Sequence, residues 1–376
     1  MRPDPSAVLR PTSESDLAEA IRTTQSPLAI RGGGTRPIGR PQPGAVLETG
    51  GLSGITLYEP GALTLVAGAG TPLAEVEAAL AAENQRLPFE PMDHRGLLGT
   101  TGTPTLGGMV AANASGPRRV QAGACRDSLI GVRFVDGTGS IIKNGGRVMK
   151  NVTGYDLVKL MAGSWGTLGV LTEVSFKLLP APESAATLTW QGLDAASALR
   201  LMAEALGTPW EVNGAAHLPD QRTLLRVEGF ASSVAYRADA LAKALARYGR
   251  SVTLGSEETR ALWPQVRDVA PFHAQDGDVW RLSVKPSDAA AMASKAGGEA
   301  LYDWGGGLVW LRLPEGDDLR ARLGAFTGHA TLVRASAETR HRIAPFQPEP
   351  APVAALTRGL RAKFDPRGVL NPGLME

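Results

Sequence analysis

Glycine is concentrated in the first half of this chain, and that distribution constrains the fold more than any other feature of the sequence. The 376 residues include 45 glycines, and a large share of them fall between Arg31 and Gly169. Because glycine loses more backbone entropy on folding than other residues, such density is typical of segments with positive φ or of close approach to a ligand. A fold that is merely rich in loops is the alternative.

The first glycine run follows a short strand predicted at 28–30. It consists of Arg31, Gly32, Gly33, Gly34 and Thr35, with Gly39 just beyond. Consecutive glycines that leave a strand can turn several backbone N–H groups towards an anion such as a pyrophosphate. The guanidinium and the hydroxyl at the two ends of the run would add a charge and a donor. A plain loop would show the same run, so alone it is a weak signal.

Two further runs strengthen this interpretation. Residues 103–116 begin like a helix and are small throughout, with candidate site residues at Thr105, Gly107, Gly108, Ala112 and Gly116. Small side chains let a flat ring or a sugar chain lie directly on backbone, although a tight helix–sheet contact also requires them. The third run, 163–173, leads into a strand and adds Gly169 and Val170. We expect Gly33→Val to abolish ligand retention while leaving the protein folded.

A competing fingerprint lies at 68–74, where Gly-Ala-Gly-Thr-Pro-Leu-Ala follows a strand and opens a helix with the spacing of a Rossmann turn. Glu90 lies about twenty residues further on, as that motif requires. However, Glu90 is flanked by Phe89 and Pro91 rather than placed at a clear strand end. Pro72 also removes a backbone donor where a pyrophosphate would bind. A nicotinamide dehydrogenase is therefore disfavoured.

Two stretches rich in proline and alanine, 179–186 and 344–352, divide the chain, because proline at this density stops helices and is excluded from central strands. They predict units at 1–180, 181–345 and 346–376. In the first unit we expect strands at 28–30, 46–48, 63–67, 130–135, 140–143 and a half-buried strand at 173–178, with helices capped by Ser13 and begun by Pro72 at the N1 position. In the rest we expect strands at 224–227, 280–284, 308–313 and 330–333, with helices at 234–248, 287–295, 317–326 and 353–364. The middle unit should then be an α+β sheet with helices on one face.

Composition excludes several classes of protein. The 39 basic and 37 acidic residues are mixed along the chain, which argues against a nucleic-acid surface. Cys125 is the only cysteine, so the chain can form neither an internal disulfide nor an iron–sulfur cluster, and a reducing, cytoplasmic compartment fits best. No apolar stretch is long enough to span a bilayer, although docking on a membrane-bound partner stays open.

The three glycine runs, in this order and spacing, resemble the FAD domain of the vanillyl-alcohol oxidase family, also called the PCMH-type fold. The resemblance implies an α+β protein: a PCMH-type FAD-binding domain of two α/β subdomains, then an α+β cap domain with an antiparallel sheet. In that family the first loop holds the pyrophosphate, the middle segment lines the ribityl chain and the isoalloxazine, and the third contacts adenine. Covalent members carry a histidine where this chain has Thr35, so non-covalent FAD is expected.

Other segments resemble the family of FAD-binding subunits of glycolate oxidase complexes. These segments are 115–119, 122–127, 148–157, 263–283, 303–312 and 364–373. The resemblance implies a complex with a catalytic flavoprotein subunit and an iron–sulfur subunit, in which glycolate is oxidised to glyoxylate. Two alternatives stay open: a self-sufficient FAD-dependent dehydrogenase of a small 2-hydroxy acid or alcohol, and a scaffold that has lost its cofactor.

No catalytic residue is identified by these patterns, and no metal site is expected. The metal-binding relatives carry a His-Gly-Asp-Gly-Asn-x-His motif that is missing here, and the five histidines are scattered singly. Oxidation of a hydroxy acid needs a base for the hydroxyl proton and a cation for the carboxylate. Arg119, Lys150 and Arg281 could supply such a cation, but ordinary salt bridges are the simpler expectation for them. Tyr155 and Asp156 either face the cofactor or cap a helix.

Overall fold

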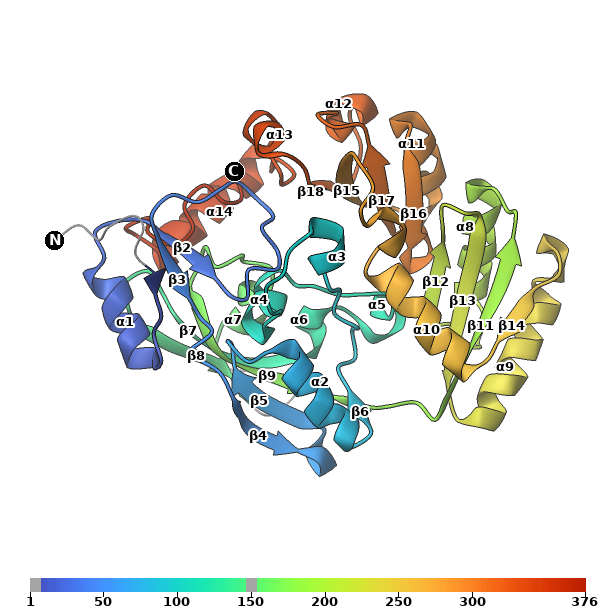
Figure 1. Ribbon diagram of the computed structural model, residues 1–376, viewed down its shortest axis with the longest axis horizontal. Coiled ribbons are helices and arrows are strands. Elements are labelled where there is room, and N and C mark those ends of the chain that lie inside the picture. The colour runs from blue at the N-terminus through green and yellow to red at the C-terminus, as the bar shows by residue number, and fades with distance from the viewer. Residues whose placement is uncertain (1–7, 147–153) are drawn as a thin grey trace.

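The computed structural model describes residues 8–146 and 154–376, which form two lobes side by side (Figure 1). The first lobe contains a three-stranded and a five-stranded sheet, together with the C-terminal segment. The second lobe is built on one eight-stranded sheet. Lys150, a candidate cation, lies outside the described residues. So do the other residues of 148–153, which are part of a segment that carries the family resemblance. Among the residues that are described, no helix is both long enough and apolar enough to cross a membrane.

The smaller sheet of the first lobe is parallel, in the order β1-β3-β2. Its strands are β1 (Val8–Leu9), β2 (Leu28–Arg31) and β3 (Ala45–Glu48), and α1 (Glu14–Thr23) connects the first two. As expected, Ser13 caps α1 by accepting a hydrogen bond from the backbone N–H of Asp16. Leu17 and Ile21 of α1 are buried against this sheet, which fixes the point where the first glycine run leaves β2.

The five-stranded sheet is antiparallel, in the order β4-β5-β9-β7-β8. Its strands are β4 (Ile55–Glu59), β5 (Thr64–Gly68), β7 (Leu129–Val135), β8 (Ile141–Gly145) and β9 (Val170–Lys177); a separate two-stranded ladder joins β6 (Gln85–Arg86) to β10 (Leu179–Pro180). The helices of the first lobe that follow are α2 (Leu73–Ala82), α3 (Arg95–Leu98), α4 (Leu106–Ala111), α5 (Arg119–Ala122), α6 (Cys125–Ser128) and α7 (Leu157–Met161). Of these, α3 and α5 contact the second lobe. Because β5 pairs antiparallel with both neighbours, the turn at 68–74 is not part of a Rossmann unit.

Three expectations for this lobe were wrong in detail. The strand predicted as half-buried is the central strand β9, and nearly all of its residues are buried because both of its faces are covered. Pro72 is the N-cap of α2 rather than its first helical residue. The stretch at 179–186, predicted as a linker, contributes residues to β10 and to β11, since its prolines fall only at a short edge ladder and between strands.

The second lobe is a single antiparallel sheet in the order β14-β11-β13-β12-β16-β17-β15-β18. Its strands are β11 (Ser184–Gln191), β12 (Gly214–His217), β13 (Arg222–Gly229), β14 (Val252–Leu254), β15 (Asp278–Ser283), β16 (Glu299–Asp303), β17 (Leu308–Leu313) and β18 (His329–Arg334). The helices are α8 (Ala195–Leu206), α9 (Ala231–Ala244), α10 (Ser256–Arg267), α11 (Ala289–Ala296), α12 (Leu319–Leu323) and α13 (Ala337–Arg342); short 3-10 turns are η1 (Pro60–Ala62) in the first lobe and η2 (Ala246–Tyr248), η3 (Ala270–Phe272), η4 (Pro286–Asp288) and η5 (Trp304–Gly306) in the second.

The eight-stranded sheet has helices on both faces, contrary to the expectation of one. Helices α8, α9, α11 and α12 bury one face, whereas α10 lies on the face that meets the first lobe (Figure 1). Leu262, Trp263 and Val266 of α10 share a hydrophobic core there with Met92 and Leu97 of the first lobe. The helix expected at 317–326 is only α12, which ends before Gly324 at φ +67°.

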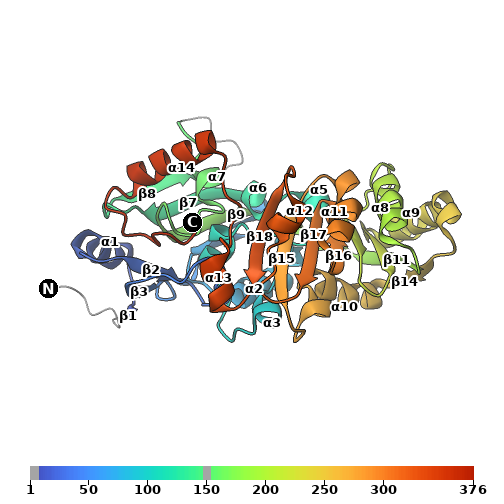
Figure 2. The same ribbon diagram turned by 90° about the horizontal axis from the view of Figure 1, so that it is seen from above.

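The C-terminal segment contacts the first lobe again after the second lobe is complete. Helix α14 (Ala351–Phe364) belongs to the side of the molecule formed by the first lobe (Figure 2), and its last residue, Phe364, packs on Phe134 of β7 with ring centroids 6.1 Å apart. The backbone N–H of Leu28 donates to the carbonyl of Val369, and Asn371 Oδ1 accepts from the N–H of Ile30. Asn371 Nδ2 also donates to the carbonyl of Trp165, so a single side chain joins β2, the third glycine run and the chain end.

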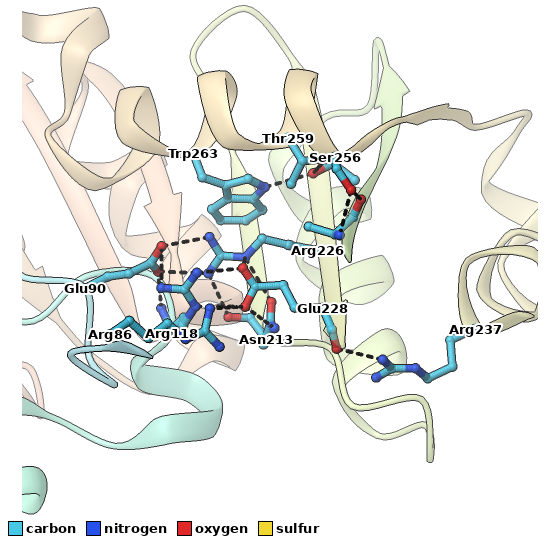
Figure 3. Close-up of polar contacts among 12 residues, drawn as sticks. Arg86, Glu90, Arg118, Asn213, Arg226, Glu228, Arg237, Ser256, Thr259 and Trp263 are labelled. Carbon is cyan, nitrogen blue, oxygen red and sulfur yellow. Dashed lines mark hydrogen bonds and ion pairs between the residues drawn. The ribbon is translucent and has the colours of Figure 1, made fainter. Parts of the chain in front are cut away.

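A buried network of ion pairs joins the two lobes (Figure 3). Arg226 of β13 donates to Glu90 at 2.8 Å, and Arg118 donates to Glu228 of β13 at 2.6 Å. Arg86 and Asn213 make further hydrogen bonds to Glu228, each 2.9 Å long. Burial alone would raise the pKa of Glu90 and of Glu228, but the arginines outweigh it and hold both pKa values below the ordinary range. Glu90, considered above as part of a dinucleotide fingerprint, is thus a residue of the lobe interface.

Replacing Arg226 should test how strongly this network holds the lobes together. Arg226→Met leaves two buried carboxylates short of a partner, so we expect the free energy of unfolding at pH 7 to fall by about 3–5 kcal/mol. Because the pKa values of Glu90 and Glu228 are lowered, the contribution of the network is present above their ordinary pKa and is lost as the pH falls through their folded-state values. Urea denaturation at pH 7, and then at a series of pH values well below the ordinary pKa of glutamate, measures both effects.

The matched control is Arg247→Met, which removes the exposed ion pair between Arg247 and Glu204. Surface pairs contribute at most about 1 kcal/mol. Equal losses in the two variants would show that the network does not carry the interface.

Candidate functional site

A cavity of about 640 Å³ lies where the first glycine run leaves β2; we call it the glycine-loop cavity. Every site residue predicted from the sequence lines it except Gly107, Ala112 and Gly116. The predicted residues in its wall are Arg31, Gly32, Gly33, Gly34, Thr35, Gly39, Thr105, Gly108, Gly169 and Val170. The three glycine runs, separated by up to about 140 residues in the sequence, therefore meet around one space.

The shape of the loop depends on backbone packing that only glycine permits. A Cβ on Gly33 would lie 1.5 Å from the carbonyl oxygen of Thr103, and a Cβ on Gly102 would lie 1.8 Å from the carbonyl of Gly33. Gly34 has φ +70°, a left-handed conformation that side chains rarely adopt. The expectation that Gly33→Val would spare the fold was therefore wrong, because the substitution forces apart two backbone segments.

The predicted residues that lie outside the cavity serve other contacts. A Cβ on Gly107 would meet Ala69 at 2.9 Å, and one on Gly116 would meet the carbonyl of Glu90 at 2.2 Å. Both glycines therefore allow close packing, the alternative that small residues always leave open. Ala112 lines a second cavity, described below.

The wall of the glycine-loop cavity is cationic, and much of that charge was missed by the sequence analysis. Arg36, Arg40 and Arg340 line it together with Arg31, and none of its lining residues is an aspartate or a glutamate. Arg340 comes from α13, more than 300 residues after the loop, and its guanidinium also donates to the carbonyl of Pro37. An arginine so distant in sequence gives no local signal.

Several polar atoms in this wall are buried without a hydrogen-bond partner among the described residues. They are Arg40 Nε, Gln42 Oε1, Ser164 Oγ and Arg340 Nε. Buried polar groups are almost always paired in native proteins, because an unpaired one costs about 1–3 kcal/mol. Together with four arginines and no carboxylate in the wall, this local shortage of partners fits an elongated, anionic ligand such as a dinucleotide.

A second cavity, of about 970 Å³, lies between the lobes; we call it the interface cavity. Ile38 and Trp165 line both cavities, so the two spaces adjoin. The walls of the interface cavity are partly apolar, with Met92, Trp310 and Phe346 among them. A ligand held in the glycine-loop cavity can therefore present one end to the space between the lobes.

Arg119 and Arg281 line the interface cavity, and the expectation of ordinary salt bridges for them was wrong. Neither guanidinium forms an ion pair or a hydrogen bond with a residue in the described ranges; both lie over the ring of Trp304, at 4.5 and 5.2 Å from its centroid. Burial, with Arg119 nearby, lowers the pKa of Arg281 to about 10, so it keeps its charge at neutral pH. The guanidinium groups of Arg119 and Arg281 are therefore positively charged, and neither is paired with a carboxylate of a described residue.

His94 is the one histidine that lines the cavity from the first lobe. Its Nδ1 accepts a 3.0 Å hydrogen bond from Nε of Arg36, so the neutral ring carries its proton on Nε2. Burial and the charge of Arg36 hold the pKa of His94 well below its ordinary value. His94 is therefore a neutral donor at physiological pH and not a ready proton acceptor.

Asp156 caps α7, which was one of the two alternatives expected for it, while Tyr155 is 88% exposed.

The sequence of this chain is similar to a described protein family and to several described proteins. Residues 5–145 match the family described as an FAD binding domain. The chain is 38% identical to the glycolate oxidase subunit GlcE of Escherichia coli over 93% of both proteins. It is also 30% identical to the glycolate oxidase subunit GlcD of Bacillus subtilis, over 60% of this chain and 48% of that protein.

Solved structures show the same fold at low sequence identity. An alkyldihydroxyacetonephosphate synthase superposes with a TM-score of 0.69 at 15% identity, over 97% of this chain and 76% of that one. Together with the match to the FAD binding domain, this likeness confirms the expected architecture, a mixed α/β FAD-binding lobe with an antiparallel cap sheet. By itself the likeness shows the fold alone.

Asp303 gives the site a pH dependence that can be measured. Its carboxylate is buried and accepts a hydrogen bond from the backbone N–H of Trp304, and burial raises its pKa to about 7. Because the folded-state pKa is raised, the contribution of this group is most favourable below its unfolded pKa and is lost as the pH rises through about 7. Asp303→Asn keeps the acceptor, so we expect it to stabilise the protein by roughly 2 kcal/mol at pH 8 and by much less at pH 5.

Thermal unfolding at the two pH values measures this difference. Asp194→Asn is the matched control, because Asp194 is another N-cap aspartate that accepts a backbone N–H, but in solvent. If Asp303→Asn destabilised the protein equally at both pH values, the raised pKa would be disproved.

Proposed function

The chain belongs to the GlcE family of FAD-binding oxidoreductases, and from that membership we propose that it is the FAD-binding subunit of a glycolate oxidase complex. In that complex glycolate is oxidised to glyoxylate, and electrons pass through the flavin to an iron–sulfur partner. The observation that carries the proposal is the glycine-loop cavity, which is lined by four arginines and no carboxylate and adjoins the interface cavity.

We assign the cofactor to the residues that the geometry brings together. Arg31, Thr35 and the glycines between them are proposed to hold the pyrophosphate, Thr105 and Gly108 to line the middle of the cofactor, and Gly169 and Val170 to contact adenine. Residues 1–180 then form the FAD-binding domain, 181–345 the cap, and 346–376 a segment that returns to the first domain. Thr35 offers no imidazole for a covalent link, which supports non-covalent FAD.

FAD, when bound, supplies a two-electron acceptor. The residues of this chain contribute binding and position: the arginines would neutralise the phosphates, and Trp165 and Ile38, which line both cavities, would contact the part of the cofactor that lies where the cavities adjoin. His94, held neutral with its Nε2–H unpaired, offers a donor to an oxygen in the interface cavity.

The electrons must leave through another protein or a diffusible acceptor. Cys125 is the only cysteine, and it is fully buried, with its pKa raised by that burial, so it offers no ligand set for a cluster. The similarity to GlcE and GlcD supports a complex with a flavoprotein subunit of the GlcD kind, and we propose an iron–sulfur subunit as the partner that takes the electrons.

The proposal is tested by the visible spectrum of the flavin under anaerobic conditions. We expect the purified chain to show a flavin spectrum that glycolate leaves unchanged, and we expect glycolate to bleach it once the partner subunits are added. Arg340→Met should lower flavin affinity about tenfold, the loss of one charge-assisted hydrogen bond. Arg342→Met, on the same helix but bonded to Gly316 of the second lobe, is the control and should retain flavin.

Two results would contradict the proposal. A chain that purifies without flavin and does not take it up would exclude the cofactor. Bleaching by glycolate without any partner would instead favour the self-sufficient dehydrogenase.

A further inference from the structure

The interface cavity holds more positive charge than the described residues neutralise. Arg119, Arg126 and Arg281 line it, against one carboxylate, Glu349, whose Oε1 accepts a hydrogen bond from the hydroxyl of Thr357. Arg126 is about half exposed and lies near Asp127. Arg119 and Arg281 form no ion pair within residues 8–146 and 154–376, and both line the cavity. Asp127 and Asp303 act on them only as nearby charges that oppose the lowering of their pKa values by burial.

The two guanidiniums are brought together although like charges repel. They come from different lobes, Arg119 from α5 and Arg281 from β15, and both lie over the indole of Trp304. A cation–π contact contributes about 0.5–2 kcal/mol, which is less than the cost of taking a charged group from water. The ring therefore positions the two cations but does not neutralise them.

Trp304 is itself held in a strained and specific position. It has φ +54°, a left-handed conformation that is rare for a bulky side chain. Asp303 accepts its backbone N–H at 2.7 Å, and its indole Nε1 donates to the carbonyl of Gly116 in the other lobe at 3.0 Å. Strain that the surroundings enforce is common at ligand sites, where it fixes a side chain for binding.

Two further side chains that line the cavity can donate a hydrogen bond. His94 presents a protonated Nε2, and Ser283 adds a hydroxyl. A small carboxylate is planar and accepts paired hydrogen bonds from guanidinium groups, and its hydroxyl or keto oxygen needs one further donor. Arginine is well suited to such an anion because its N–H groups form a rigid fork.

We propose that Arg119 and Arg281, positioned by Trp304, form a binding site for a small carboxylate within this chain, in the interface cavity. The identification of the anion as a 2-hydroxy or 2-keto acid rests on the proposed function; the anion site itself does not. The chain then binds the acid next to the flavin instead of only carrying the cofactor for a partner.

The test is isothermal titration of the purified, flavin-loaded chain with oxalate and with glycolate, and with glycolamide as the neutral analogue. We expect both anions to bind and glycolamide not to bind. Arg281→Met and Arg119→Met should each weaken binding at least tenfold, and Arg281→Lys should restore part of it. Arg247→Met is the matched control, since Arg247 also lies over an aromatic ring, that of Tyr248, but at the surface.

The absorbance of the flavin in each sample separates this inference from the proposed function. Flavin at about one per chain with no binding of either anion would overturn the carboxylate site and leave the cofactor assignment intact. Equal binding of glycolate and glycolamide, or anion affinity unchanged in both methionine variants, would also overturn it. If one variant fails to fold, the other variant and the neutral analogue still decide.

Discussion

The buried ion pairs between Glu90, Arg118, Arg226 and Glu228 are the contacts on which the rest of the structure depends. They lie where the FAD-binding lobe meets the second lobe, and their carboxylates stay ionised because each faces at least two arginines. Arg226 also lies 4.3 Å from the ring centroid of Trp263 on α10, so the network is continuous with the hydrophobic core of the interface. Removing one partner would leave a buried charge only partly compensated, so we expect the network to favour a single arrangement of the two lobes.

That arrangement fixes the interface cavity. Arg118 and Arg119 are neighbours in the chain but have opposite roles: Arg118 is neutralised across the interface, whereas Arg119 faces the cavity without a partner. Gly116, two residues before, packs on Glu90 and accepts the hydrogen bond of Trp304. The distance between the two lobes therefore sets the distance between the cations that we propose to bind the carboxylate.

The sequence predicted well which residues of the first glycine run line the glycine-loop cavity, because that signal is local. A run of glycines shows in the sequence itself that the backbone there is tightly packed or left-handed. The Thr35 hydroxyl and the small residues at 105–108 are likewise visible without knowledge of their neighbours in space. The same reasoning also predicted that Gly107 and Gly116 contact the cofactor, whereas in the structure they allow close packing. In a sequence, a small residue that contacts a ligand cannot be distinguished from one that allows close packing. The sequence did not predict that Arg36, Arg40 and Arg340 line the glycine-loop cavity. It also did not predict that Arg119 and Arg281 line the interface cavity without an ion pair to a described residue. Both features depend on residues far away in the sequence. The parts of the fold that were wrong, such as the burial of β9, likewise depend on neighbours in space.

The central claim is that the glycine-loop cavity holds one FAD without a covalent bond. The most direct measurement is the amount of flavin in the native protein, followed by its distribution between supernatant and pellet after acid precipitation. This account predicts about one FAD per chain, recovered entirely in the supernatant. Absence of flavin from native protein that had been supplied with FAD would contradict the assignment of the cavity, and flavin retained in the pellet would contradict the non-covalent mode.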